Sequence, residues 1–183
     1  MIPYTTTRDA TPPHTCCRSS RSGKAPKDET AGHRFHRIAT VIDCCTKEVI
    51  GYAMDDHYQT PLISRAIRNA ARNRNLSTDA IFHSDRGSNY MSAEFGRTLE
   101  RFGLRRSAGR TGICFDNAMA ESFFGALKNE RVSRVTYLTR EAARQDITRY
   151  IEFWYNRKRL HSTVGYRPPC EVHAEYEKLR IAA

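Results

Sequence analysis

Regular hydrophobic patterning in this chain begins at residue 38. Residues 38–42 form a β-branched run and residues 48–54 (EVIGYAM) form a second, separated by a short polar turn, which predicts a β-hairpin. Thr60 and Pro61 then open a segment whose apolar residues recur at helical spacing to about residue 73, and Pro61 suits a first helical turn. The patterned region therefore starts with two strands and an amphipathic helix.

Strands and helices alternate further along. Residues 80–83 predict a short strand, followed by a helix that Ser92 can cap and by another short strand at 104–107. Two more helices are expected, one over about 118–131 and a longer one that Thr139 caps and that ends near residue 157. This order of elements predicts the α/β class, with a mixed sheet flanked by helices.

The first 37 residues have a different character. They hold seven Lys or Arg and three Asp or Glu among Pro, Ser, Thr and Gly, and no apolar period runs through them. Such a composition does not offset the entropy lost on ordering, so we predict a flexible or non-homologous N-terminal arm over 1–37. A single core over 38–173 and a C-terminal tail over 174–183 would follow it.

Charge narrows the class of partner. The 183 residues contain 30 Lys and Arg against 20 Asp and Glu, a formal net charge of +10, which favours nucleic acid over membrane as a polyanionic partner. No apolar run approaches the roughly 18 residues that a membrane span needs. The first residues lack a basic stretch followed by an apolar one, so we expect no secretory leader and a cytoplasmic location.

Two carboxylates stand at positions suited to chemistry. Asp85 follows the predicted strand 80–83, where open α/β sheets place functional groups, although an Asx-type turn explains it equally well. Glu121 lies in the first turn of a predicted helix, where the helix dipole alone also favours an acid. Lys128 returns to the same helix face seven residues later. A functional interpretation has Asp85 and Glu121 share a hard divalent cation while Lys128 meets a phosphate.

Three sequence blocks carry a family resemblance. The blocks HSDRGSNY (83–90), DNAMAESFFGALKNE (116–130) and FWYNRKRLHSTVGYRPP (153–169) resemble the signature blocks of DDE-type bacterial insertion-sequence transposases, which share the retroviral-integrase catalytic core. Thirty-five residues separate Asp85 from Glu121, the interval of the family's DD(35)E label. The predicted hairpin is similar to the second and third strands of that core, so the resemblance covers about 38–173.

The resemblance implies an RNase H-like sheet with two Mg²⁺ ions, or Mn²⁺ as a substitute, held between three carboxylates. Such a site cleaves DNA and transfers strands by in-line displacement, acting on double-stranded DNA at transposon ends and target, and the protein can be a homo-oligomer. By resemblance Asp85 is the second acid, Glu121 the third, and Lys128 the contact with transposon-end DNA. Asn89 and Tyr90, beside Asp85, either shape the site or touch DNA.

Basic residues follow an aromatic group near the C-terminus. Arg157 and Arg159 come directly after the aromatic residues 153–155, a combination that suits a DNA backbone, although solvated helix faces carry similar charges. Trp154 and Tyr150 lie one helical turn apart in an apolar stripe, which predicts that both belong to the core.

One part of the family pattern is missing. In the family the first acid lies in an initial strand shortly before the hairpin, and no such strand is evident here. Asp28 is nearest to the expected distance, but its surroundings lack apolar alternation and Pro26 precedes it; Asp43 is at a hairpin position that is not a metal ligand in the family. We therefore predict a partial transposase core, inactive rather than active. The alternatives are a non-catalytic nucleic-acid-binding remnant and another RNase H-like nuclease, which would cleave without joining ends.

Overall fold

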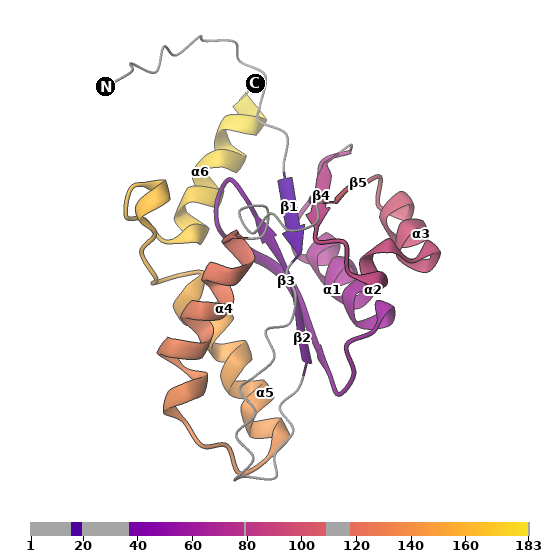
Figure 1. The fold of residues 1–183 in the computed structure, drawn as a ribbon. Coiled ribbons are helices and arrows are strands. Elements are labelled where there is room, and N and C mark those ends of the chain that lie inside the picture. Colours follow the sequence, from indigo (N-terminus) through magenta and orange to yellow (C-terminus); the bar gives the residue numbers. More distant parts are fainter. Residues whose placement is uncertain (1–15, 20–36, 79, 109–117, 183) are drawn as a thin grey trace, which may run out of the picture.

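A five-stranded mixed sheet forms the centre of the molecule in the computed structural model, which describes residues 16–19, 37–78, 80–108 and 118–182 (Figure 1). The strand order is β3-β2-β1-β4-β5. β2 is antiparallel to both β1 and β3, whereas β4 is parallel to both β1 and β5. The predicted α/β class with a mixed sheet is confirmed. The strand bounds are Cys16–Ser19, Arg37–Asp43, Val49–Asp55, Ile81–Ser84 and Arg105–Ala108 for β1 to β5.

The predicted hairpin is β2 and β3, and its turn is built by Asp43. The buried carboxylate of Asp43 accepts a hydrogen bond from the Cys45 amide at 2.9 Å and another from the Thr46 hydroxyl at 3.0 Å. Lys47 then closes the turn in the left-handed region, with φ of 67°. Asp43 is therefore a structural residue of the turn.

The sheet includes an initial strand, so the expectation that this strand is missing is wrong. β1 occupies the central position, where Cys17 pairs with Asp43 of β2 on one side and with Phe82 of β4 on the other. Its sequence, Cys-Cys-Arg-Ser, has no apolar alternation from which a strand could be predicted. Two neighbouring strands supply hydrogen-bond partners on both edges, and that tertiary setting overrides the weak local preference.

Helices α1 (Thr60–Asn73), α2 (Ser88–Met91) and α3 (Ala93–Arg101) gather on one side of the sheet (Figure 1). Phe82 of β4 packs there against Phe95 of α3, ring centroids 5.4 Å apart, within a core that also takes in the apolar face of α1. The Ser92 hydroxyl accepts a hydrogen bond from the Phe95 amide at 3.2 Å, which confirms the predicted N-cap.

Helices α4 (Ala118–Glu130) and α5 (Arg140–Arg149) enclose a second core on the opposite face. The Thr139 hydroxyl caps α5 by accepting from the Ala142 amide at 3.1 Å, as predicted. The expected single helix to about residue 157 instead passes into a π-helical turn over Tyr150–Tyr155. That turn shifts the facing of successive side chains, so Tyr150 is buried as predicted while Trp154 remains 48% exposed, contrary to expectation.

The C-terminal segment is helical across the boundary predicted at residue 173. Helix α6 runs over Pro169–Ala182, so residues of the predicted tail continue a helix. Its His173 lies 3.3 Å from the buried carboxylate of Glu48, at the end of the hairpin turn, and Glu48 also pairs with Arg74 after α1. These contacts join α6 to the hairpin. In the described part of the chain no helix is both long and apolar enough to cross a membrane.

Candidate active site

Asp85 lies directly after β4 and shapes the loop that follows. Its Oδ1 accepts a hydrogen bond from the Gly87 amide at 2.7 Å, which is the Asx-type turn considered from sequence, and the side chain is half-buried. A Cβ at residue 87 would stand 2.8 Å from that Oδ1, so a larger residue there would displace the Asp85 carboxylate. The strand end and the turn together hold the Asp85 carboxylate at the C-terminal end of β4.

Asn89 and Tyr90 fix the same loop by hydrogen bonds to Tyr58. The Asn89 amide donates to the Tyr58 carbonyl oxygen at 3.0 Å, and the Tyr90 hydroxyl makes a hydrogen bond with the Tyr58 hydroxyl. The Tyr90 ring is 1% exposed and packs edge-on against Phe95. For Tyr90 the contacts favour shaping the site over touching DNA, because a buried ring offers no surface to DNA.

Glu121 and Lys128 both lie on the exposed side of α4, as their seven-residue spacing predicts. The opposite side of the helix buries Phe123 and Leu127 in the second core. α4 also packs against β1, the strand that neighbours β4 in the sheet. The fold thus brings the helix of Glu121 to the central strand beside the one that ends at Asp85.

The described residues do not complete a three-carboxylate metal site. Mg²⁺ prefers a near-octahedral set of oxygen ligands, which the resemblance assigns to three acids. β1, the strand where the family's first acid would lie, contains no Asp or Glu. Within the part of the chain that the structure describes, no group of three or more His, Cys, Asp or Glu side chains is arranged to hold a metal. Asp28, the nearest acid in sequence, lies outside the described residues.

Glu130 is the last residue of α4 and of the sequence block 116–130, and the sequence did not reveal its contacts. Its carboxylate accepts hydrogen bonds from the Tyr150 hydroxyl at 2.8 Å, from Trp154 Nε1 at 3.3 Å and from Arg159 Nε at 2.9 Å. Burial acts to raise the pKa of this carboxyl, but the hydrogen bonds from Tyr150, Arg159 and Trp154 outweigh burial and lower the pKa overall. Arg159, predicted to contact DNA, therefore also has an internal partner. Arg157 is exposed, with its guanidinium 5.4 Å from the centre of the Phe153 ring.

Asn156 also has a role that the sequence did not reveal. It follows the aromatic residues 153–155 and precedes Arg157 and Arg159, the two arginines predicted to contact DNA. Its side chain accepts from the Val49 amide at 3.0 Å and donates to the Val49 carbonyl oxygen at 3.0 Å. The strand pairing of β2 and β3 shifts at this point, so that Ile50 is an extra, bulged residue. The amide of Asn156 thus fastens the C-terminal block to the edge strand of the sheet.

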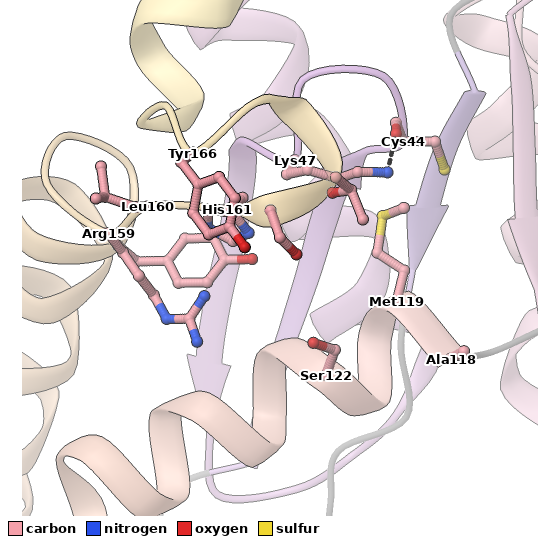
Figure 2. Close-up of a pocket in the computed structure, with 12 residues that line it drawn as sticks. Cys44, Lys47, Ala118, Met119, Ser122, Arg159, Leu160, His161 and Tyr166 are labelled. Atoms are coloured by element: carbon pink, nitrogen blue, oxygen red, sulfur yellow. Dashed lines mark hydrogen bonds between the residues drawn. The ribbon is translucent and has the colours of Figure 1, made fainter.

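A pocket of about 980 Å³ opens between the hairpin turn, the beginning of α4 and the loop after the π-helical turn (Figure 2). Cys44 and Lys47 line it from the hairpin, and Ser122 lines it from α4. The C-terminal loop supplies Arg159 to Thr163 and Tyr166, and Ala118, Met119 and Tyr155 complete the lining. The residue next to Ser122 along α4 is Glu121, so the pocket adjoins the helix of the candidate active site.

His161, in the wall of this pocket, is expected to make folding sensitive to acid. Burial lowers the pKa of its imidazole, and the charges of Arg159 and Lys47 lower it further against the opposing effect of Glu130. A folded-state pKa below the ordinary 6.5 means that the unfolded chain binds more protons, so stability falls as the pH drops below about 6.5. Because the ring is half-exposed, the contribution should be a few tenths of a kcal/mol up to about 1 kcal/mol.

Urea unfolding at about pH 7.5 and about pH 5 measures this effect. We expect His161→Gln to reduce the loss of unfolding free energy between the two pH values by more than His57→Gln, the same change at an exposed histidine. An equal loss in the His161 variant and the unaltered chain would contradict the assignment.

The fold is of the mixed α/β class, and comparison with known proteins identifies its family. Residues 22–114 match the family described as "Integrase core domain", and residues 103–169 match a second family with the same description. The chain belongs to the integrase core domain family. The first match begins within the segment 1–37, upstream of the region that the sequence blocks covered.

Curated relatives confirm the resemblance to insertion-sequence transposases. The "Transposase for insertion sequence element IS904" of Lactococcus lactis subsp. lactis (strain IL1403) is 36% identical over 132 residues, 72% of this chain and 52% of that protein. The "Transposase InsF for insertion sequence IS3A" of Escherichia coli (strain K12) is 39% identical over 132 residues, 72% of this chain and 46% of that protein. The chain thus spans about half the length of the curated relatives it matches.

Solved structures share the fold. The catalytic core domain of BIV integrase superposes with a TM-score of 0.61 at 14% sequence identity, covering 90% of this chain and 97% of that one. The HTLV-2 integrase catalytic core domain, in a trimeric form in complex with magnesium, superposes with a TM-score of 0.60 at 14% identity, covering 91% of this chain and 99% of that one. The RNase H-like architecture predicted from the resemblance is confirmed.

Proposed function

We propose that this chain is the integrase-type core of an insertion-sequence transposase and that it binds double-stranded DNA at transposon ends and target. The observation that carries the proposal is the placement of Asp85 at the end of β4 and of Glu121 on α4, which packs against the neighbouring strand β1. Relatives that are named transposases support the same class.

Each predicted site residue has a proposed role. Asp85 and Glu121 are the second and third acids of the family's metal-binding set. Lys128, exposed on the face of α4 that carries Glu121, contacts the phosphates of a transposon end, and the exposed Arg157 contacts phosphates further along the duplex. Magnesium, when bound in a complete family site, activates the attacking hydroxyl and stabilises the leaving oxygen. The described residues do not supply that complete site.

We therefore propose that the chain binds DNA without cleaving or joining it. Labelled transposon-end DNA, incubated with the purified chain and Mg²⁺ or Mn²⁺, should remain uncut, and Glu121→Gln should bind and process DNA like the unaltered chain. Metal-dependent cleavage that disappears in Glu121→Gln would contradict this. In that event Asp28→Asn decides whether Asp28 supplies the first acid, and a strand-transfer assay separates a transposase from a nuclease that cleaves without joining.

A gain-of-function variant makes the test sharper. Position 18 of β1 pairs with His83, two residues before Asp85 on the parallel strand β4, and alternate residues of a strand share one face of the sheet. Arg18→Asp therefore introduces a carboxylate at the position of β1 that is paired next to the end of β4. We expect this variant to acquire metal-dependent cleavage. Ser19→Asp introduces a carboxylate at the next position of β1, where successive residues alternate between the faces of a strand, and should not.

Self-association is part of the proposal. The molar mass of the purified chain in solution, measured with and without DNA, tests whether the chain self-associates. A homo-oligomer would give a mass that is a multiple of 21.0 kDa, and a monomer in both conditions would contradict it.

A further inference from the structure

The pocket beside α4 is chemically suited to an anion. It is lined by two cationic side chains, Lys47 and Arg159, and none of its lining residues is an Asp or Glu. Hydroxyl groups that can donate hydrogen bonds complete the wall, supplied by Ser122 from α4 and by Ser162 and Thr163 from the C-terminal loop. α4 begins in the same wall, with its dipole favouring negative charge at that end. Cations, hydroxyls and a helix start are the groups that bind phosphate oxygens.

Lys47 retains capacity to bind such a group. Its ammonium donates one hydrogen bond, to the Cys44 carbonyl oxygen at 2.6 Å (Figure 2), out of the three that an ammonium can make. In the portion of the chain that the structure describes, no carboxylate lies within ion-pair distance of Lys47. The left-handed turn at Lys47 fixes the origin of its side chain at the pocket wall.

Arg159 is held in place by Glu130, outside the pocket lining, and by Tyr155, a residue of the lining. Its Nε donates to Glu130, which is not a lining residue, and its guanidinium lies 5.8 Å from the centre of the Tyr155 ring. Five N–H groups are available to a guanidinium, so those on the terminal nitrogens remain to bind an anion. An arginine fixed in this way loses little side-chain entropy when a ligand binds.

Both cations, Lys47 and Arg159, also act electrostatically on His161 in the pocket wall. Arg159 and Lys47 each help to lower the pKa of the His161 imidazole, after burial, so the field at the pocket wall is positive although Glu130 opposes it. A positive, solvent-open pocket lined by hydroxyls attracts a polyanion from solution.

We propose that this pocket is a second DNA contact, a subsite that binds the phosphodiester backbone through Lys47 and Arg159 with Ser122, Ser162 and Thr163. The proposal rests on the proposed function, since it takes DNA as the ligand. Ser122 follows Glu121 on α4, so a strand bound at the candidate active site can continue into the pocket. The C-terminal block, residues 153–169, would then serve to build the subsite's outer wall.

Salt dependence of DNA binding tests the subsite. Each phosphate contact contributes about 0.9 to the slope of log affinity against log salt concentration, irrespective of DNA sequence. With a short fluorescein-labelled duplex of arbitrary sequence and fluorescence anisotropy, we expect Lys47→Gln to reduce the slope by about 0.9. Ser122→Glu, at an exposed site, should weaken binding about fivefold, since a like charge near a phosphate costs roughly 1 kcal/mol in water.

Matched variants control for net charge and for the fold. Lys178→Gln removes the same charge from exposed α6, and Ser133→Glu adds the same charge to an exposed serine outside the pocket. Each should change binding less than its counterpart. If the unaltered chain binds the duplex and the pocket variants behave like their controls, the subsite is overturned while the proposed function stands. If the unaltered chain does not bind the duplex at any salt concentration, the proposed function itself fails.

Discussion

Gly51→Ala is expected to lower the free energy of unfolding by about 3 kcal/mol or more, because α1 lies directly against β3 at this residue. A Cβ at residue 51 would stand 2.5 Å from the Ala70 amide nitrogen, 2.6 Å from the Ala66 carbonyl oxygen and 2.6 Å from Ala70 Cβ. Two of these atoms are helix backbone, which cannot move aside as a flexible side chain can. The variant must separate α1 from the sheet and so open the first core, measurable as a lower urea midpoint.

Gly125→Ala is the matched control for this prediction. Gly125 lies within α4, and a Cβ built there has no neighbouring atom within 4 Å. Alanine is a better helix former than glycine, so this variant should be more stable than the unaltered chain by roughly 0.5–1 kcal/mol. If both variants were as stable as the unaltered chain or more so, the close approach of α1 and β3 would be refuted.

Asn156→Ala should cost about 2–4 kcal/mol of unfolding free energy, the second largest effect that we expect. The side chain is 5% exposed and satisfies both the amide and the carbonyl group of Val49. Alanine would leave two buried backbone groups of the bulged edge strand without these partners, and an unsatisfied buried group costs about 1–3 kcal/mol. Hydrogen exchange should also quicken at the Val49 amide, the donor to Asn156.

Asn129→Ala is the control, because Asn129 is exposed on α4 and the change removes the same amide. Its unfolding free energy should stay within about 0.5 kcal/mol of the unaltered chain. Urea unfolding of both variants, with unchanged slopes, gives the comparison. A loss at residue 156 no larger than the loss at residue 129 would mean that the C-terminal block is not fastened to β3 through Asn156.

The elements predicted correctly are those whose evidence is local. The hairpin was evident from two β-branched runs, α1 from its apolar spacing after Pro61, and the starts of α3 and α5 from the capping residues Ser92 and Thr139. In each case neighbouring residues contain the whole cause, since strand alternation, helical periodicity and capping are short-range effects.

The elements that escaped prediction depend on distant partners. β1 has no strand-like pattern and forms because β2 and β4 supply hydrogen bonds on both of its edges. Asn156 meets Val49 across 107 positions of sequence. Trp154 was expected in the core, but the π-helical turn leaves it at the surface, where Nε1 donates to Glu130. Pairings between residues far apart in the chain leave no periodic trace from which they could be inferred.

For the candidate site the division is similar. The sequence by itself determined the family, through three blocks and the interval between Asp85 and Glu121, because these residues have the order and the spacing that the family shows. Only the tertiary structure decided that Tyr90 is buried, that Arg159 is held by Glu130, and that the hairpin turn, α4 and the C-terminal loop enclose one cationic pocket. Burial and charge pairing depend on which elements pack against each other, and elements far apart in the sequence meet only when the sheet has formed.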